Sequence, residues 1–520
     1  MTVIRRSNLF NKLFIILLLI FSIFIFTSCD LVEKAPLEYP DNDQIIGDDD
    51  LGNEDEQEDQ ITIDYLDIYS INDLHGAIEE DEYGRGLARM GNFLIEKKTT
   101  NPDNTVILVA GDMFQGTAIS NLTYGGVVVE ALNYIGIDAF TIGNHEFDWG
   151  VQRIIDLIDE KSSQVKVNFP LLGANIYKIS TNQRAEWVND YVIIERGGLK
   201  IGIIGVIGDY QINSITAPYV EGYKFLNPVP IIKSLAFELR ANKNVDVVIV
   251  LAHDGDTTNT PSDSFNRKLS YLEGMYSVDA VINAHTHYYY DRTIPRQNRV
   301  ELPVVQAGSS GSHIGYIRLN LDKKTKKITS VSVDTIQVGY SLSENNPTIL
   351  EIIEKHRQEV KKKLDIDEAL ATAGTYISKD TFANWAVNVM KKYSKADFAV
   401  VNSGAFRGGF PIRQNEIIDV QRVYQFMPFD NVVLTCKLTG RQLRLLARNS
   451  GFVFSSNFDV NYLVDYKEYT IATVDYLFYK TNYEFLNGRE ITNLHEYFRD
   501  YLILELKTYK QQNKLFSLDK

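Results

Sequence analysis

Six apolar runs rich in β-forming residues, each ending at a polar residue, constrain the fold of this chain more than any other feature of its sequence. Segments with helical spacing of apolar residues separate some of these runs. Strands that alternate with helices predict a layered α/β domain, and near-continuous apolar strands indicate sheets that are covered on both faces. The apolar runs span residues 63–71, 106–110, 139–142, 201–206, 245–252 and 278–284, and two of the helical segments span residues 126–135 and 151–161.

Histidines gather at the ends of these runs. Five of the eight histidines in the chain lie just beyond a predicted strand: His75, His145, His253, His285 and His287. Functional side chains of layered α/β proteins collect where strands end and loops begin. A hydrogen-bonded structural role would account for any one of these histidines by itself. Their common position favours one shared site instead.

Acidic and amide side chains accompany the histidines and complete a set of metal ligands. Side chains two residues apart in an extended segment point to one side, as in Asp73-x-His75 and His285-x-His287. Imidazole nitrogens with carboxylate oxygens suit Mn, Zn, Co or Fe ions better than Mg or Ca ions. The candidates are too many for one ion, so we expect two divalent ions, which together can hold a hydroxide and neutralise a phosphate. These candidates are Asp73, His75, Asp112, Asn144, His253, His285 and His287.

The N-terminus has the pattern of a secretory signal. Three basic residues precede an apolar run over residues 13–26, which is short of the roughly 20 residues that a membrane-spanning helix needs. The run ends at Phe26-Thr27-Ser28-Cys29, which resembles the lipobox of bacterial lipoproteins, where the cysteine is lipidated. We therefore predict a signal peptide over residues 1–29, a lipid anchor at Cys29 and a location outside the cytoplasm, in the cell envelope. An uncleaved signal anchor is the alternative.

Residues 30–60 are strongly acidic. This segment contains thirteen Asp or Glu residues, one lysine and few apolar residues. Such a segment cannot bury enough surface to offset the entropy of ordering it, so we predict a solvated, disordered tether. Calcium binding is the alternative, although the segment lacks the glycine-turned spacing of a dedicated calcium loop. The formal net charge of −15 is concentrated here, and the rest of the chain has no basic excess for nucleic-acid binding.

The polar motifs at the strand ends resemble those of the calcineurin-like metallophosphoesterases. The motifs are Asp73-x-His75, Gly111-Asp112, Gly143-Asn144-His145-Glu146, His253 and His285-x-His287. More narrowly, the strings over residues 111–117 and 143–150 are similar to those of the secreted 5′-nucleotidase / UDP-sugar hydrolase family. The resemblance covers residues 62–510.

This resemblance implies an α/β chain with two domains. Residues 61–342 would form a four-layer metallophosphoesterase β-sandwich flanked by helices. Residues 368–512 would form a C-terminal α+β 5′-nucleotidase domain that binds the substrate. Residues 343–367 would link the two, with a helix predicted over residues 346–367 from the spacing of its apolar residues.

The resemblance also implies a role for each polar residue of the first domain. One metal site would contain Asp73, His75, Asp112 and His287, and the second would contain Asp112, Asn144, His253 and His285, with Asp112 as the bridge. Many relatives have Gln or Asn in place of His287, although imidazole is a competent ligand. His145 would be the catalytic histidine, which stabilises charge on the phosphoryl group and helps the leaving group. Asp148 would orient His145 and favour its protonated form, or cap a turn.

The match loosens in the second domain, where the substrate would bind. Residues 402–408 resemble the family's Asn-Gly-Gly-Gly-Ile-Arg segment, in which Arg407 would clamp a phosphate or carboxylate unless it forms only a surface salt bridge. Pro428-Phe429-Asp430-Asn431 resembles Pro-Phe-Gly-Asn, so Phe429 and Tyr476 would sandwich the base unless they only pack in the core. Lys480-Thr481-Asn482-Tyr483 replaces the family's Gly-Gly-Asp-Gly and offers an amide in place of a carboxylate. The candidate substrate-binding residues are Asn402, Arg407, Phe429, Asn431, Tyr476 and Asn482.

The motifs and the resemblance together predict an extracytoplasmic hydrolase with two metal ions that releases phosphate from nucleotides by attack of a metal-bound hydroxide. The changes in the second domain leave other substrates open: a UDP-sugar, a 2′,3′-cyclic nucleotide or a non-nucleotide phosphate. A third hypothesis is a surface lipoprotein that binds a ligand without catalysis, and the unbroken ligand set argues against it. We expect the partners to be a phosphate-ester substrate and, through Cys29, the membrane, but no nucleic acid.

Overall fold

The computed structural model describes residues 61–159, 165–256, 264–297 and 299–518. These residues belong to one compact unit, Glu58–Lys520. The predicted signal peptide, its candidate lipidation site Cys29 and the predicted tether over residues 30–60 lie outside the described residues. No helix among the described residues is both long enough and apolar enough to span a bilayer.

Two six-stranded sheets form the core of the first half of the described chain. The first contains β1 (Tyr65–Ile71), β2 (Thr105–Val109), β3 (Ala139–Thr141), β4 (Leu171–Leu172), β13 (His313–Leu321) and β14 (Ile328–Gln337), in the order β14-β13-β1-β2-β3-β4. The second contains β6 (Tyr191–Arg196), β7 (Leu199–Ile207), β9 (Val247–His253), β10 (Ala280–Asn283), β11 (Tyr289–Ile294) and β12 (Leu302–Ala307), in the order β11-β12-β10-β9-β7-β6. Strands β1 to β4 run parallel, as do β7, β9, β10 and β12, so their carboxyl ends meet at one edge of each sheet.

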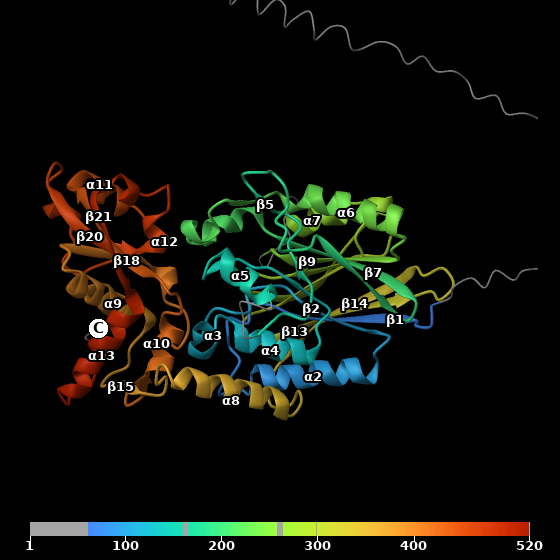
Figure 1. The fold of residues 1–520 in the computed structure, drawn as a ribbon, viewed down its shortest axis with the longest axis horizontal. Coiled ribbons are helices and arrows are strands. Elements are labelled where there is room, and N and C mark those ends of the chain that lie inside the picture. The colour runs from blue at the N-terminus through green and yellow to red at the C-terminus, as the bar shows by residue number, and fades with distance from the viewer. Residues whose placement is uncertain (1–60, 160–164, 257–263, 298, 519–520) are drawn as a thin grey trace, which may run out of the picture. The chain divides into compact units, whose positions relative to one another are not determined.

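The two sheets pack face to face between two layers of helices. Because side chains alternate along a strand, Ile68 of β1 shares a core with Ile249 of the second sheet, whereas its neighbour Tyr69 packs in the core that contains α2 and α4. Helices α6 and α7 cover the other face of the second sheet. Figure 1 shows α2 and α4 on one side of the strands and α6 and α7 on the other. The bounds of these helices are α2 Leu87–Thr100, α4 Gly126–Ile135, α6 Pro228–Lys243 and α7 Phe265–Ser270. The predicted four-layer α/β sandwich is therefore confirmed.

Helix α8 (Pro347–Lys361) follows the sandwich and begins where the sequence predicts it. The side chain of Asn346 caps it by accepting hydrogen bonds from two backbone N–H groups of its first turn. The carbonyl of Val360 accepts two N–H groups from the turn that follows, and Ile366 then enters the core. The helix is shorter than the predicted range of 346–367 because this turn takes the place of a further helical turn.

A five-stranded sheet with helices forms the second half of the described chain, which is the predicted α+β arrangement. Its strands are β16 (Phe398–Asn402), β18 (Val432–Thr439), β19 (Phe452–Phe454), β20 (Glu468–Val474) and β21 (Arg489–Tyr497), in the order β19-β16-β20-β18-β21. Its helices are α9 (Lys379–Ser394), α10 (Val420–Phe426), α11 (Gly440–Leu446), α12 (Asp475–Phe478) and α13 (Phe498–Gln511). Buried aromatic side chains hold them together; the ring centres of Phe382 in α9 and Phe426 in α10 are 4.8 Å apart.

Several short elements connect these parts of the described chain. They are helices α3 (Ala118–Leu122) and α5 (Val151–Ile158), the strand pair β5 (Ile176–Lys178) and β8 (Tyr223–Phe225), and the strand pair β15 (Ala369–Thr372) and β17 (Ile417–Asp419). Helix α5 begins at the predicted residue, and a single 3-10 turn, η1 (His145–Phe147), precedes it. The loop from β3 through η1 to α5 contains both predicted catalytic residues.

Candidate active site

The candidate metal ligands lie where parallel strands of the two sheets end. Asp73 follows β1, Asp112 follows β2 and Asn144 follows β3 in the first sheet. In the second sheet, His253 is the last residue of β9 and His285 follows β10. Because parallel neighbours end at the same edge, residues that are far apart in the sequence come together there.

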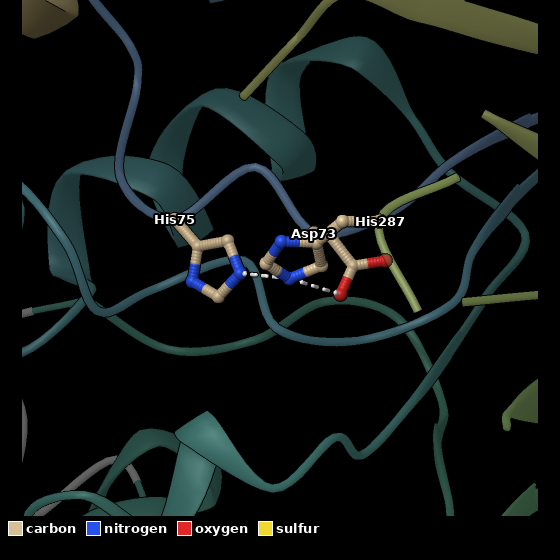
Figure 2. Close-up of side chains that lie close together, drawn as sticks. All are labelled: Asp73, His75 and His287. Carbon is tan, nitrogen blue, oxygen red and sulfur yellow. Dashed lines mark hydrogen bonds and ion pairs between the residues drawn. The ribbon is translucent and has the colours of Figure 1, made fainter. Parts of the chain in front are cut away.

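A first group contains Asp73, His75 and His287, whose candidate ligand atoms all lie within 4.8 Å of one another. Nε2 of His287 is 3.0 Å from Nε2 of His75 and 3.5 Å from Oδ1 of Asp73, and Figure 2 shows the three side chains turned toward one another. The carboxylate of Asp73 also accepts hydrogen bonds from the Asn72 side chain, at 2.6 Å, and from the backbone N–H of His285, at 3.0 Å. Such outer contacts fix the orientation of a ligand.

A second group contains Asp112, His253 and His285, again with candidate ligand atoms within 4.8 Å of one another. Nε2 of His253 lies 3.1 Å from Oδ2 of Asp112 and 3.2 Å from Oδ1 of Asn144. The structure therefore brings six of the seven predicted ligands into two neighbouring groups, and the seventh, Asn144, contacts the second group. Asp112 belongs to the second group, and its role as a bridge to the first remains a prediction.

The chemistry of these donors fits two transition-metal ions. Nδ1 of His253 donates to the carbonyl of Ala110 at 2.7 Å, which orients the ring so that Nε2 is the nitrogen directed at the carboxylate of Asp112. Burial lowers the pKa of His75 well below its ordinary value and lowers the pKa of His285 to about 3, so both imidazoles are neutral. Neutral imidazole is the form that binds a metal ion.

The backbone at the candidate ligands is strained. Five of the seven have positive φ angles between 48° and 72°, a region that L-residues rarely adopt: Asp73, His75, Asp112, His285 and His287. Residues held in such conformations persist only where the surrounding structure fixes them, and they cluster at functional sites. The strain is thus shared by residues that converge on the two groups.

Glu146 fixes this backbone through hydrogen bonds, a role that the sequence analysis did not assign. Its carboxylate accepts the backbone N–H groups of Asp112, Met113 and Gly143, each at 2.8 Å. It thereby joins the ends of β2 and β3. The only sequence signal was its place in the Gly143-Asn144-His145-Glu146 motif.

His145 and Asp148 form a hydrogen-bonded pair at the edge of the second group. Nδ1 of His145 lies 2.8 Å from Oδ2 of Asp148, and the backbone N–H of His145 donates to Oδ1 of Asp112 at 2.8 Å. Burial by itself would lower the pKa of His145, but the nearby carboxylates of Asp148 and Asp112 outweigh it and raise that pKa. The pair therefore favours a protonated imidazole, as the sequence analysis predicted.

A cavity of about 330 Å³ opens beside both groups and receives side chains from both halves of the chain. Among the predicted residues, those that line it are Asp112, Asn144, His145, Asp148, His285, His287, Asn402, Arg407, Phe429, Asn431 and Tyr476. Asn482 is not among the described residues that line the cavity. Lining residues that the sequence analysis missed include Thr216, Tyr219 and Asp430. The first two come from the loop before β8, which has no motif to mark it.

Two of the substrate-binding candidates, Phe429 and Arg407, lie close to the His145–Asp148 pair. The ring of Phe429 lies 5.6 Å from the imidazole of His145, centre to centre, and the guanidinium carbon of Arg407 lies 5.1 Å from the centre of the Phe429 ring. Oδ1 of Asn402 is buried without a hydrogen-bond partner in the described part of the chain. A buried polar atom with no partner, on the wall of a cavity, is available to a ligand.

Known protein families match the two halves separately. Residues 66–289 match the calcineurin-like phosphoesterase model, and residues 365–457 match the 5′-nucleotidase C-terminal domain model. The chain thus contains a segment similar to calcineurin-like phosphoesterases, followed by a segment similar to the C-terminal domain of 5′-nucleotidases. The first match contains every candidate metal ligand, and the second contains Arg407 and Phe429.

Two relatives are similar to this chain over most of its length. Endonuclease YhcR of Bacillus subtilis (strain 168) is 28% identical over 412 residues, which cover 73% of this chain and 32% of that protein. Snake venom 5′-nucleotidase of Naja atra is 26% identical over 429 residues, which cover 73% of this chain and 76% of that protein. The chain thus spans about a third of the length of the first relative and about three-quarters of the second.

A solved structure has a similar fold. The crystal structure of a 5′-nucleotidase precursor from Thermus thermophilus matches with a TM-score of 0.69 at 18% identity. The match covers 88% of this chain and 100% of that one. At this identity the likeness concerns the fold.

Proposed function

We propose that the protein is an extracytoplasmic, metal-dependent phosphohydrolase that releases phosphate from nucleotides. The observation that supports this most is the single cavity in which candidate metal ligands, the His145–Asp148 pair and aromatic side chains of the C-terminal half meet. A metal centre alone would not distinguish one phosphate ester from another. Phe429 and Tyr476 on the same cavity favour an ester with a flat organic group, such as a nucleotide base.

Two divalent ions would be held by the two groups of ligands. Asp73, His75 and His287 would hold the first, and Asp112, Asn144, His253 and His285 the second, with Asp112 proposed as the bridge. When bound, such ions neutralise phosphate charge and activate the attacking water. The mixture of nitrogen and oxygen donors fits Mn, Zn, Co or Fe.

The protein's own side chains would supply proton transfer and orientation. Asp148 holds Nδ1 of His145, so a proton on Nε2 faces the cavity and can stabilise a phosphoryl oxygen or protonate the leaving oxygen. Arg407, which lines the same cavity, would neutralise the phosphate. Each aromatic face that stacks on the base contributes about 1–3 kcal/mol.

The proposed location and anchor rest on the N-terminal sequence. The basic start, the apolar run and the string ending at Cys29 support a lipid anchor in the cell envelope, with residues 30–60 as a tether. The similarity to a venom 5′-nucleotidase is consistent with action outside the cell. The proposed domains of the body remain residues 61–342, the linker 343–367 and residues 368–512.

A metal-loaded protein that lacks residues 1–30 tests the proposal. It is purified, loaded with Mn²⁺, Zn²⁺, Co²⁺ or Fe²⁺ and assayed for phosphate release from AMP, UDP-glucose, 2′,3′-cyclic AMP and p-nitrophenyl phosphate. We expect AMP to be the preferred substrate. Preference for UDP-glucose or the cyclic nucleotide would support the alternative leaving groups, and inactivity on all four would reject hydrolysis.

Three variants assign the activity to this site. Asp112→Asn and His145→Ala should each reduce phosphate release from AMP by on the order of a hundredfold or more. His495→Ala is the matched control, because His495 is exposed on β21 and should leave the rate unchanged. Full activity in Asp112→Asn would contradict the site assignment.

A further inference from the structure

One arginine is buried directly behind the loop that presents Phe429 to the cavity. Arg499 lies in the first turn of α13 and is only 2% exposed. Its Nη1 atom is 3.3 Å from the carbonyl oxygens of Met427 and Pro428 and 3.2 Å from that of Phe429. One guanidinium group thus contacts three successive carbonyls of the loop.

The same guanidinium also pairs with the side chain that follows Phe429. Nη2 of Arg499 donates to Oδ1 of Asp430. The other oxygen of Asp430 accepts the indole N–H of Trp149 at 2.9 Å. On the far side, the guanidinium carbon of Arg499 lies 3.7 Å from the centre of the buried Tyr424 ring. The loop is therefore fixed on its main chain and on its side chain.

We propose that Arg499 is a positioning residue, which with Asp430 holds the 427–430 loop so that Phe429 faces the substrate's organic group. The inference rests on the proposed function, in which Phe429 contacts the base. It concerns affinity for the organic half of the substrate, whereas the phosphate end is handled by residues that Arg499 does not contact.

We call the contacts of Arg499 with the 427–430 loop the clamp. The clamp depends on Asp430, a residue at which this chain differs from the family segment that it resembles. The family segment that resembles residues 428–431 has glycine where this chain has Asp430, and glycine offers no carboxylate to an arginine or an indole. Without that carboxylate, a guanidinium as buried as that of Arg499 would lack its counter-ion. Arg499 and Asp430 therefore depend on each other.

Lysine cannot replace the arginine at this site. The planar guanidinium donates in two directions at once, to the carbonyls through Nη1 and to Asp430 through Nη2, and it stacks on Tyr424. A lysine ammonium is a point charge on a flexible stem and cannot make all of these contacts. Arg499→Lys therefore keeps the positive charge but removes the planar group that makes all of these contacts together.

Steady-state kinetics of the metal-loaded full chain tests the proposal. Arg499→Lys should raise KM for AMP about tenfold, as expected when a base–aromatic stack weakens, and should change kcat less than about threefold. The same variant should keep kcat/KM for glycerol 2-phosphate within about twofold, because that ester has no flat ring to stack. Unchanged KM for AMP, or an equal loss on both substrates, would overturn the positioning role.

A matched control separates positioning from general destabilisation. Arg240 is a partly buried arginine of α6, away from the cavity, that likewise donates to two carbonyls and to a carboxylate, that of Asp279. Arg240→Lys should lower the melting temperature as Arg499→Lys does, while the ratio of AMP to glycerol 2-phosphate activity stays at its wild-type value. A shifted ratio in Arg240→Lys would overturn the inference.

Hydrogen exchange tests the clamp without turnover. Peptides that cover residues 424–433 should exchange faster in Arg499→Lys than in the wild type or in Arg240→Lys. Wild-type exchange in those peptides would overturn the clamp even if the enzyme were active. If the wild type hydrolyses no phosphate ester, the proposed function fails while this measurement still decides whether Arg499 orders the loop.

Discussion

Gly143 shows how closely the backbone must approach the candidate metal ligands. A Cβ atom at this position would lie 2.3 Å from Oδ1 of Asp112 and 2.8 Å from Cε1 of His253. Contacts this short would force both side chains to move, and neither has free space in a packed interior. We predict that Gly143→Ala lowers the bound metal and reduces phosphate release by on the order of a hundredfold. Elemental analysis of the purified protein and the AMP assay measure the two effects.

Gly451→Ala is the control for this substitution. No atom lies within 4 Å of the position that its Cβ would take, and the residue is exposed. Metal content and activity should match those of the wild type. Wild-type metal content in Gly143→Ala would contradict the close approach that the structure describes.

Residue types that are uncommon and cluster at strand ends could be predicted as functional from the sequence. Residues whose role depends on how neighbouring strands align could not. Five histidines at strand ends are improbable without a shared function, so one shared site could be predicted from their positions in the sequence, whereas the resemblance separated the candidate ligands from His145. Glu146 could not be assigned, because it acts on backbone N–H groups of a neighbouring strand end. Asn482 was selected by resemblance alone, in a segment whose residues have changed, and it does not line the cavity in the described structure.

At the scale of elements, Asp475 ties together the two segments that present aromatic rings to the cavity. It is the first residue of α12, and its Oδ1 accepts the side-chain amide of Asn431 and the backbone N–H of Tyr476, both at 2.8 Å. Asn431 lies just before β18 and two residues after Phe429. The spacing between the two rings therefore depends on one buried carboxylate.

This carboxylate makes stability depend on pH. Burial raises the pKa of Asp475 to about 6 from an ordinary value of 3.8, although its hydrogen bonds oppose the shift. Because the folded state prefers the protonated acid, the stability that protonation gives is complete below pH 3.8 and is lost as the pH rises through about 6. We predict that the free energy of unfolding falls by about 2–3 kcal/mol over this window in the wild type relative to Asp475→Asn. Urea titrations at several pH values measure the difference, and parallel profiles for the two proteins would refute it.

Element boundaries followed from the sequence where strands are buried on both faces. The run over residues 106–110 became β2 (Thr105–Val109), and the segment 126–135 became α4 with the same bounds. Edge strands could not be predicted from continuous apolar runs, because many of their side chains are exposed to solvent. Strand β14 alternates exposed and partly buried side chains along Ile328–Gln337, so it has no continuous apolar run.

At the scale of the whole molecule, the candidate metal site joins segments that the chain connects only through long loops. Asp73 and His287 are separated by more than two hundred residues in sequence, and they come from the ends of different sheets. Bound ions would therefore act as cross-links between the two sheets. They would also compensate the buried carboxylates of Asp73 and Asp112, which are 0% and 1% exposed.

Removing the metal should consequently destabilise the folded protein as well as inactivate it. A ligand that binds only the folded state stabilises it by about 3 kcal/mol when its free concentration is about 100 times its dissociation constant. We predict that chelation lowers the melting temperature measured by calorimetry, and that adding Mn²⁺ or Zn²⁺ restores it together with phosphate release. In His253→Ala, which loses one donor of the second group, the same chelator should shift the melting temperature less. Equal melting temperatures for the metal-loaded and chelated wild type would contradict a site that holds the two sheets together, because ions that only assist chemistry would leave the fold unaffected.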